Sequence, residues 1–341
     1  MVRRYSELPL IYPENVEPFD KRFEVIGAFN PGVAEFGGKT LLLVRVAVRP
    51  RAEGNVLRVP VLKDGRIDVL ELDKSEFDCS DSRLAVGREK SYLTSMSYFA
   101  VALSEDGVRF EVDGSRVLLP EDELEAYGIE DPRITYIDGY YYIVYSAVSE
   151  VGICGMMKRT KDFKTYEKVG AVLHPDNKDA ALFPEKIGGK YYMLHRPSTS
   201  EFGPPDIWIA ESENLRDWGN HRHVLGVRPG SWDCRRIGSS GIPVLTDRGW
   251  LVVYHGANES NTYCLGAILL KKDEPWKVLG RTEQPFLKPE LPCEKEGFFC
   301  NVVFACGGIE RGGMLKIYYG AADKFVCGAE ISISEIMETL K

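Results

Sequence analysis

One carboxylate of this sequence stands where a predicted strand begins, directly ahead of a proline. Asp131 lies in the tetrapeptide Glu-Asp-Pro-Arg at residues 130–133. Pro132 has a fixed backbone and cannot donate to a strand ladder, so it suits the first residue of a strand. The carboxylate then stands at the head of a strand, where it could face a pocket shared by several strands. The tetrapeptide by itself favours a plainer alternative, an aspartate that caps a turn.

Basic side chains fall at corresponding points of later segments. Taken singly, each is best explained as a solvated charge or as an ion-pair partner in an acidic protein. Their recurrence at matching positions indicates one shared site, because convergent arginine, lysine and histidine are what binding an oxyanion such as phosphate requires. Arg45 and Arg133 occupy similar places in earlier segments. The four candidate phosphate ligands are Lys178, Arg196, Arg236 and His255.

Aromatic rings beside polar groups are a third candidate element. Pyranose rings pack their C–H faces on aromatic rings while their hydroxyls bond to carboxylates. Asp323, which ends a hairpin strand, is a candidate for holding sugar hydroxyls, with a simple turn residue as the alternative. For any one of the rings, core packing is the favoured explanation. The rings are Tyr92, Tyr98, Trp208, Trp232, Tyr254 and Tyr319.

A repeated phrase shows how residues far apart in sequence can share one site. Each copy is a turn followed by an apolar strand that ends at a polar residue. The copies span residues 38–45, 139–145, 189–195, 249–255 and 313–319. Most follow a second apolar stretch through a tight turn, which predicts a hairpin. Hairpins repeated at intervals of roughly 50–65 residues predict the blades of a propeller, in which every blade begins at one central pocket.

We therefore expect an all-β protein, a five-bladed β-propeller that forms a single domain over residues 1–341. A short C-terminal helix is predicted at residues 334–341, with Ser334 as its N-cap. The long interval between Arg49 and Asp131 holds extra material. Long insertions in a compact β fold are more often functional loops than filler.

Composition excludes several classes of protein. The 341 residues carry a net charge of -8, which disfavours nucleic acid as a partner. No apolar run approaches the ~20 residues that span a bilayer, and the N-terminal residues lack the apolar core of a signal peptide. The eight cysteines form no Cys-x-x-Cys pair, so we expect buried free thiols rather than a zinc site or disulfides. A cytoplasmic protein is the resulting expectation.

Seven motifs, in this order and spacing, together resemble glycoside hydrolase family 130. They are Phe-Asn-Pro-Gly at 29–32, Glu-Asp-Pro-Arg at 130–133, Leu-Phe-Pro-Glu-Lys at 182–186, His-Arg-Pro at 195–197, Trp-Gly-Asn-His at 218–221, Tyr-His-Gly at 254–256 and Tyr-Tyr-Gly-Ala-Ala-Asp at 318–323. The resemblance extends from about residue 20 to the end of the chain. Members of the family are five-bladed propellers, mostly mannoside phosphorylases with a minority of β-mannosidases.

The resemblance implies a role for each candidate residue. Asp131 matches the family's general acid, which acts with inversion and, in studied members, through a substrate hydroxyl. The four cations named above match the residues that hold phosphate. Residues implied in substrate binding are Asn30, Arg45, Arg133, Asp179, Tyr254 and Asp323. No metal or organic cofactor is implied, and the expected partners are an oligosaccharide and inorganic phosphate as co-substrate, with a homo-oligomer left open.

Chemistry then distinguishes three candidate functions. An inverting hydrolase needs a second carboxylate to activate water, about 6.5–9.5 Å from the acid. Phosphate arrives as an anion and needs only cations to position it, so the retained cations favour a phosphorylase over a β-mannosidase. A non-catalytic sugar-binding propeller is the third candidate.

The overall pattern resembles members acting on β-1,2-linked mannosides. Residues 97–100 (Ser-Tyr-Phe-Ala) depart from the Ser-His-Leu of many relatives, and we expect this stretch, Tyr98 included, to border the acceptor sugar.

Overall fold

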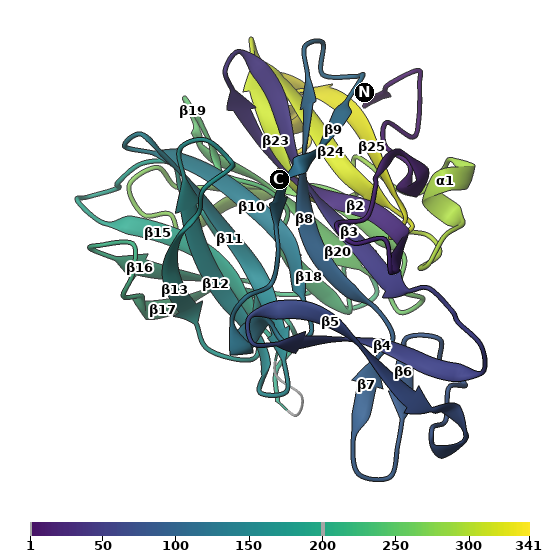
Figure 1. Ribbon diagram of the computed structural model, residues 1–341. Coiled ribbons are helices and arrows are strands. Elements are labelled where there is room, and N and C mark those ends of the chain that lie inside the picture. Colours follow the sequence, from purple (N-terminus) through teal and green to yellow (C-terminus); the bar gives the residue numbers. More distant parts are fainter. Residues whose placement is uncertain (1, 199–201) are drawn as a thin grey trace.

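Five antiparallel sheets form the ring that the repeated hairpins predict (Figure 1). The computed structural model describes residues 2–198 and 202–341. Within these residues each blade is a sheet of four strands, and the fourth blade carries one extra short strand. The structure confirms the prediction of an all-β, five-bladed propeller.

The four strands of each of the first three blades are paired in the order in which they occur along the chain. Blade one contains β2 (Phe23–Phe36), β3 (Lys39–Pro50), β8 (Met96–Ser104) and β9 (Glu111–Leu118). Blade two contains β10 (Ile129–Ile137), β11 (Tyr140–Ser149), β12 (Gly152–Thr160) and β13 (Glu167–Leu173). Blade three contains β14 (Asn177–Leu182), β15 (Tyr191–Pro197), β16 (Ile207–Ser212) and β17 (Gly219–Leu225).

The last two blades add a small strand and a strand from the other end of the chain. Blade four contains β18 (Arg236–Ser239), β19 (Val244–Thr246), β20 (Gly249–Ala257), β21 (Tyr263–Leu270) and β22 (Val278–Arg281). Blade five contains β23 (Val303–Arg311), β24 (Met314–Ala321), β25 (Phe325–Ser332) and β1 (Arg3–Arg4). The N-terminal strand pairs antiparallel with β25, so both ends of the chain share one sheet and close the ring.

The five copies of the repeated phrase become the second strand of each blade: β3, β11, β15, β20 and β24. Four of the copies open on a glycine with φ between +80° and +86°, and the copy at Gly249 has φ +142°. A side chain is strained in this left-handed region, whereas glycine adopts it readily. Glycine therefore sets the hairpin turn in every blade.

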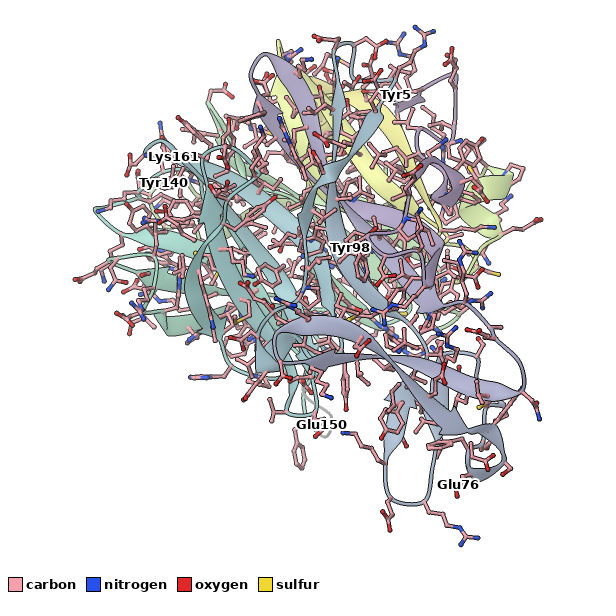
Figure 2. All side chains as sticks on the ribbon, in the orientation of Figure 1. Tyr5, Glu76, Tyr98, Tyr140, Glu150 and Lys161 are labelled. Atoms are coloured by element: carbon pink, nitrogen blue, oxygen red, sulfur yellow. The ribbon has the colours of Figure 1, made fainter. Side chains whose placement is uncertain are left out.

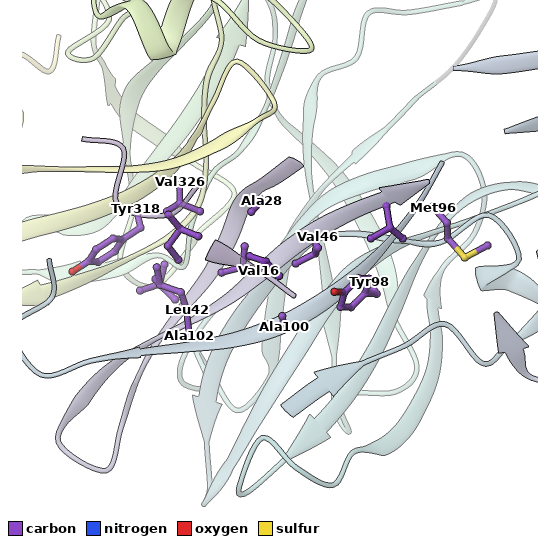
Figure 3. Close-up of a cluster of buried hydrophobic side chains, with 14 of the residues drawn as sticks. Val16, Ala28, Leu42, Val46, Met96, Tyr98, Ala100, Ala102, Tyr318 and Val326 are labelled. Carbon is purple, nitrogen blue, oxygen red and sulfur yellow. The ribbon is translucent and has the colours of Figure 1, made fainter. Parts of the chain in front are cut away.

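Apolar side chains fill the spaces between neighbouring blades and under the N-terminal segment. Figure 3 shows one such cluster, which joins Val46 and Ala100 of blade one to Tyr318 and Val326 of blade five. Tyr98, labelled in Figure 2 and Figure 3, belongs to this cluster. It is fully buried, with its ring edge-on to Phe19 at 5.1 Å. The expectation that Tyr98 borders an acceptor sugar is therefore wrong.

The insertion in blade one forms two hairpins rather than irregular loops. In the first, β4 (Val56–Lys63) pairs with β5 (Arg66–Asp73), and in the second, β6 (Leu84–Val86) pairs with β7 (Ser91–Leu93). Figure 1 shows both hairpins projecting from one side of the ring, at the lower right. The insertion touches the loop before β23, because the Arg83 guanidinium lies over the Phe299 ring at 5.5 Å.

Helices are short. The predicted C-terminal helix is α2 (Ile333–Glu338), which follows Ser332 as its N-cap rather than Ser334. The others are α1 (Pro292–Lys295) and the 3-10 turns η1 (Pro13–Asn15), η2 (Lys74–Glu76) and η3 (Glu123–Glu125). In the described part of the chain, no helix has the length and apolar character needed to cross a membrane.

Candidate active site

All five blades contribute to one pocket of about 330 Å³. Eight of the residues predicted from the sequence line it: Asn30, Arg45, Asp131, Lys178, Asp179, Arg196, Arg236 and Asp323. They come from segments up to nearly 300 residues apart in the chain, and the ring brings them together. The pocket holds a carboxylate-rich side, around Asp131 and Asp323, and a cation-rich side, around Lys178.

Three polar residues of the pocket sit on bulges in the first strand of a blade, in the middle of β2 for Asn30 and near the strand start for Asp131 and Asp179. Asn30, Asp131 and Asp179 have φ values of 45°, 54° and 56°, and the strand register shifts at each of them. Asparagine and aspartate tolerate this left-handed backbone better than other side-chain-bearing residues. A bulge leaves residues unpaired and re-aims their side chains. The bulges therefore place three polar side chains on the pocket wall.

Asp131 is held through one of its two oxygens. Its Oδ1 accepts hydrogen bonds from Asn30 Nδ2 at 2.9 Å and from an Arg45 guanidinium nitrogen at 3.0 Å. Arg45 also binds Glu130 Oε1 at 2.5 Å and Ser97 Oγ at 3.1 Å, and its guanidinium lies over the Phe29 ring. Since Oδ1 faces only donors, a proton on Asp131 belongs on Oδ2.

Asp323 has an unusual environment for an acid. Its side chain is part-buried on the pocket wall. Burial raises the pKa of Asp323 to about 7; Arg45 opposes this effect, and the charges of Asp131 and Glu130 add to it. Near neutral pH this group can therefore either accept or donate a hydrogen bond, as a ligand of sugar hydroxyls must.

Two cations on the cation-rich side form no ion pair with a described carboxylate. Arg196 pairs with Asp179 Oδ2 at 2.9 Å. Arg236 donates to the Tyr263 hydroxyl at 3.0 Å and to Asn261 Oδ1 at 2.9 Å, which are neutral partners. Among residues 2–198 and 202–341, no carboxylate forms an ion pair with Lys178 or Arg236. An anion entering the pocket thus meets two cations that are not already neutralised.

Asp179 organises the buried layer behind these cations. It is almost fully buried and contacts Arg133 at 3.1 Å, Arg196 at 2.9 Å and His255 Nε2 at 3.2 Å. Burial alone would raise its pKa, but Arg196, His255 and Arg133 together hold the pKa of Asp179 well below the usual value. Burial lowers the pKa of His255 despite the nearby carboxylate, so this imidazole is neutral at pH 7.

Two predicted ligands lie in that buried layer and not on the pocket wall. Arg133 is 1% exposed and donates to the carbonyl oxygens of Asp131 and Ser239 as well as to Asp179. Its predicted contact with substrate is corrected to a positioning role, because it ties together the starts of blades two, three and four. His255 is 0% exposed and contacts Ser240 and Asp179, so it supports the phosphate side from behind.

Tyr254 is not brought to the pocket. Side chains alternate between the two faces of a strand, so its neighbour His255 faces the site while Tyr254 faces away. Its hydroxyl donates to Asp233 Oδ2 at 2.7 Å and accepts from Arg281 Nε at 3.0 Å in the protein core. The prediction that Tyr254 binds substrate is therefore wrong.

Sequence reasoning missed several residues of the pocket wall. They lie in loops beside blades four and five or at the edge of those blades: Asn261, Tyr263, Phe299, Cys300, Val302 and Phe304. None belongs to the repeated phrase, which located the other residues. Their position in the sequence was the available signal. Asn261 and Tyr263 follow β20, and the other four lie just before β23 or at its start. In the described part of the chain, no group of three or more His, Cys, Asp or Glu residues has the arrangement of a metal site.

Known proteins resemble this chain in sequence and in architecture. A family model described as β-1,4-mannooligosaccharide phosphorylase matches residues 83–341. The chain is 47% identical over 349 residues to a β-1,2-mannobiose phosphorylase of Listeria innocua serovar 6a, covering 100% of this chain and 98% of that protein. It is 38% identical over 292 residues to a 1,2-β-oligomannan phosphorylase of Thermoanaerobacter sp., covering 84% and 95%.

A solved structure agrees with the sequence matches. The Listeria innocua β-1,2-mannobiose phosphorylase in complex with β-1,2-mannobiose superposes with a TM-score of 0.92 at 46% identity, covering 99% of both chains. The family model and the relatives cover most or all of the sequence, and four of the pocket residues (Asn30, Asp131, Arg196 and Asp323) lie in the motifs that carried the resemblance. This chain belongs to glycoside hydrolase family 130.

Proposed function

We propose that this protein is an enzyme that catalyses inverting, reversible phosphorolysis of a β-1,2-linked manno-oligosaccharide, giving α-mannose 1-phosphate and a shortened acceptor. The observation that carries the proposal is the pairing of one donor-held carboxylate, Asp131, with a wall of cations in the same pocket. Lys178 and Arg236 have no ion-pair partner among the described residues, which suits an incoming dianion. The names of the two relatives support the substrate class.

In this mechanism a phosphate oxygen attacks the anomeric carbon while the glycosidic C–O bond breaks. Asp131 supplies the proton that the leaving oxygen takes up, from Oδ2, either directly or through a hydroxyl of the substrate. Attack from the face opposite the leaving group converts the β-mannoside into the α-phosphate. Lys178, Arg196 and Arg236 hold the phosphate and offset its repulsion from the carboxylates.

The sugar is proposed to lie against the carboxylate-rich side. Asn30 and Arg45 touch Asp131 directly, so a mannosyl unit bound to them would have its anomeric carbon within reach of the acid. Asp323 would bind hydroxyls of the same unit. We further propose that the reaction needs no metal or organic cofactor, and that it occurs in the cytoplasm, where a sugar phosphate remains available for metabolism.

The test is incubation with β-1,2-mannobiose or β-1,4-mannosylglucose, with and without inorganic phosphate, followed by NMR of the products. We expect α-mannose 1-phosphate from the β-1,2-linked sugar only when phosphate is present. Free mannose formed regardless of phosphate would refute the proposal and identify a hydrolase. A product with the β configuration would refute inversion.

Two variants connect that activity to the pocket. Asp131→Asn keeps the size of the side chain but removes the acid, so we expect near-complete loss of turnover in both directions. Arg236→Ala removes an unpaired cation, and we expect the KM for phosphate to rise about tenfold or more. The matched control is Arg216→Ala, which removes an exposed arginine from an outer turn of blade three. Equal phosphate kinetics in the Arg236 and Arg216 variants would refute the phosphate site.

A further inference from the structure

A second cavity, of about 740 Å³, lies on the opposite face of the strands that carry the phosphate ligands. Lys178 and Arg196 are paired neighbours on β14 and β15, and the next pair along is Asn177 with Pro197. Because successive side chains alternate, strands that send Lys178 and Arg196 to the central pocket send Asn177 and Pro197 to the other face. Asn177 and Pro197 line the second cavity.

The same face of blade three supplies aromatic and imidazole side chains. His195 on β15 is paired with Trp208 on β16, and both line the cavity together with Trp218 and His221. Both indoles are part-buried, so each presents some ring surface to the cavity. The Trp218 ring nitrogen donates to the Leu215 carbonyl, which fixes the plane of that ring. Fixed, part-exposed indoles are the surfaces on which pyranose C–H faces pack.

A chain of hydrogen bonds gives the cavity a defined acceptor. His195 is buried, with Nδ1 at 3.1 Å from Asn177 Oδ1 and Nε2 at 2.9 Å from His221 Nδ1. If Asn177 Oδ1 accepts, Nδ1 of His195 carries the proton, and Nε2 must accept from His221. The remaining nitrogen of the exposed His221, Nε2, is then an acceptor for a hydroxyl. Burial lowers the pKa of His195 to about 3, so the imidazole at the centre of the chain is neutral.

The charge of the cavity excludes an anion as its ligand. None of its described lining residues is a lysine or arginine. The one carboxylate among these described residues, Asp176, already accepts the backbone N–H of Ile153 at 2.7 Å. Neutral hydroxyls, aromatic faces and imidazole nitrogens match one another, whereas a phosphate group would find no lysine or arginine among the lining residues that the structure describes. The volume falls within the ~300–1,000 Å³ typical of small-molecule sites.

We propose that this cavity between blades two and three is a second, non-catalytic binding site for a neutral pyranoside chain of the same β-mannosyl class as the substrate. The choice of sugar rests on the proposed function. Trp208 and Trp218 provide the stacking surfaces, and His221 accepts a hydroxyl. Residues 177 and 197 connect the site to the phosphate ligands next to them in sequence, so a chain held here stays beside the active site between turnovers.

The experiment uses fluorine NMR of the full-length protein labelled with 5-fluorotryptophan, in the Asp131→Asn background so that sugar is not consumed. The chain has five tryptophans, and none of them is among the described residues that line the central pocket. Resonances are assigned by single tryptophan-to-phenylalanine substitutions. Titration with β-1,2-mannotetraose is expected to shift Trp208 and Trp218 along one binding curve. Trp250, only 1% exposed in the core, is the internal reference and stays fixed.

Variants separate a direct contact from a relayed effect. Trp208→Ala removes one stacking surface, so the Trp218 titration should need about tenfold more sugar. His221→Ala changes an exposed side chain of the same cavity and should also weaken binding. Tyr136→Ala removes an exposed ring of blade two that lies outside the cavity, and should leave the titration unchanged. Identical titrations in all three variants would overturn the proposal.

Further outcomes would also decide the question. The absence of any tryptophan shift up to about 10 mM sugar overturns the proposed site. Shifts produced by inorganic phosphate alone would indicate an anion site, and shifts produced by raising the protein concentration would indicate self-association; either result also overturns the proposal. The same oligosaccharide is assayed with the wild-type enzyme. Phosphate-dependent turnover without tryptophan shifts overturns only the second site, whereas shifts without turnover support a sugar site and overturn the proposed reaction.

Discussion

Replacing Asp323 by asparagine is expected to stabilise the protein above neutral pH while weakening its hold on the sugar. The side chain is part-buried and lies near Arg45, Asp131 and Glu130, and burial raises its pKa from 3.8 to about 7. Asparagine has nearly the same shape and tolerates the φ of 51° found at this position. The substitution therefore removes the ionisable group with little change in the backbone.

The sign and size of this stability change follow from proton linkage. The folded protein binds the Asp323 proton more tightly than the unfolded chain, so its free energy of unfolding falls as the pH rises from 3.8 to about 7. The full shift corresponds to about 4 kcal/mol above pH 7, at ~1.4 kcal/mol per pH unit. Water in the pocket screens a part-buried group, so we expect about half of this, roughly 2 kcal/mol. The asparagine variant has no group to ionise at this position, so its free energy of unfolding does not fall for this reason.

Thermal and urea unfolding of the wild-type and variant proteins at pH 5 and pH 8 measure the effect. At pH 8 we expect the variant to melt roughly 3 °C higher, and at pH 5, where about a third of the loss has already occurred, roughly 1 °C higher. The control is Asp64→Asn, because Asp64 has a φ of 50° but is exposed in the β4–β5 turn. A stability difference in the Asp323→Asn variant that is the same at both pH values would refute the reasoning. Its kcat/KM for the mannoside should fall.

The remaining predictions concern the buried layer and the core. In Gly238→Ala the new Cβ would lie 2.2 Å from Asp179 Oδ2 and 2.7 Å from His255 Cε1, so both side chains must move. We expect the KM for phosphate to rise roughly ten- to a hundredfold. The control is Gly114→Ala, whose new Cβ meets no atom within 4 Å and should leave this KM unchanged. Unchanged kinetics in the first variant would show that Asp179 does not position the cations. Tyr98→Ala should lower the free energy of unfolding by about 3–5 kcal/mol without altering acceptor preference in a competition assay, and a changed preference would return Tyr98 to the site.

Local sequence signals were sufficient for the hairpins and for part of the site. Each copy of the repeated phrase opens on a glycine, and the backbone at that glycine has the positive φ that side chains resist. Asn30 and Asp131 each precede a proline and adopt the left-handed backbone of a bulge. These are short-range effects, because steric limits on φ and the missing N–H of proline act within one or two residues.

The closed ring decided which of these residues meet. Tyr254 and His255 are adjacent on β20, and the alternation of side chains along a strand shows only that the two face opposite sides of the sheet. Packing against blade three places Tyr254 in a core cluster, where it bonds to Asp233, and puts His255 beside Asp179 behind the phosphate side. Tyr98 is buried for the same reason, because the N-terminal segment covers that face of blade one. Sequence periodicity fixes the two faces of a strand, but only contacts between distant segments determine which face is covered and which lines the pocket.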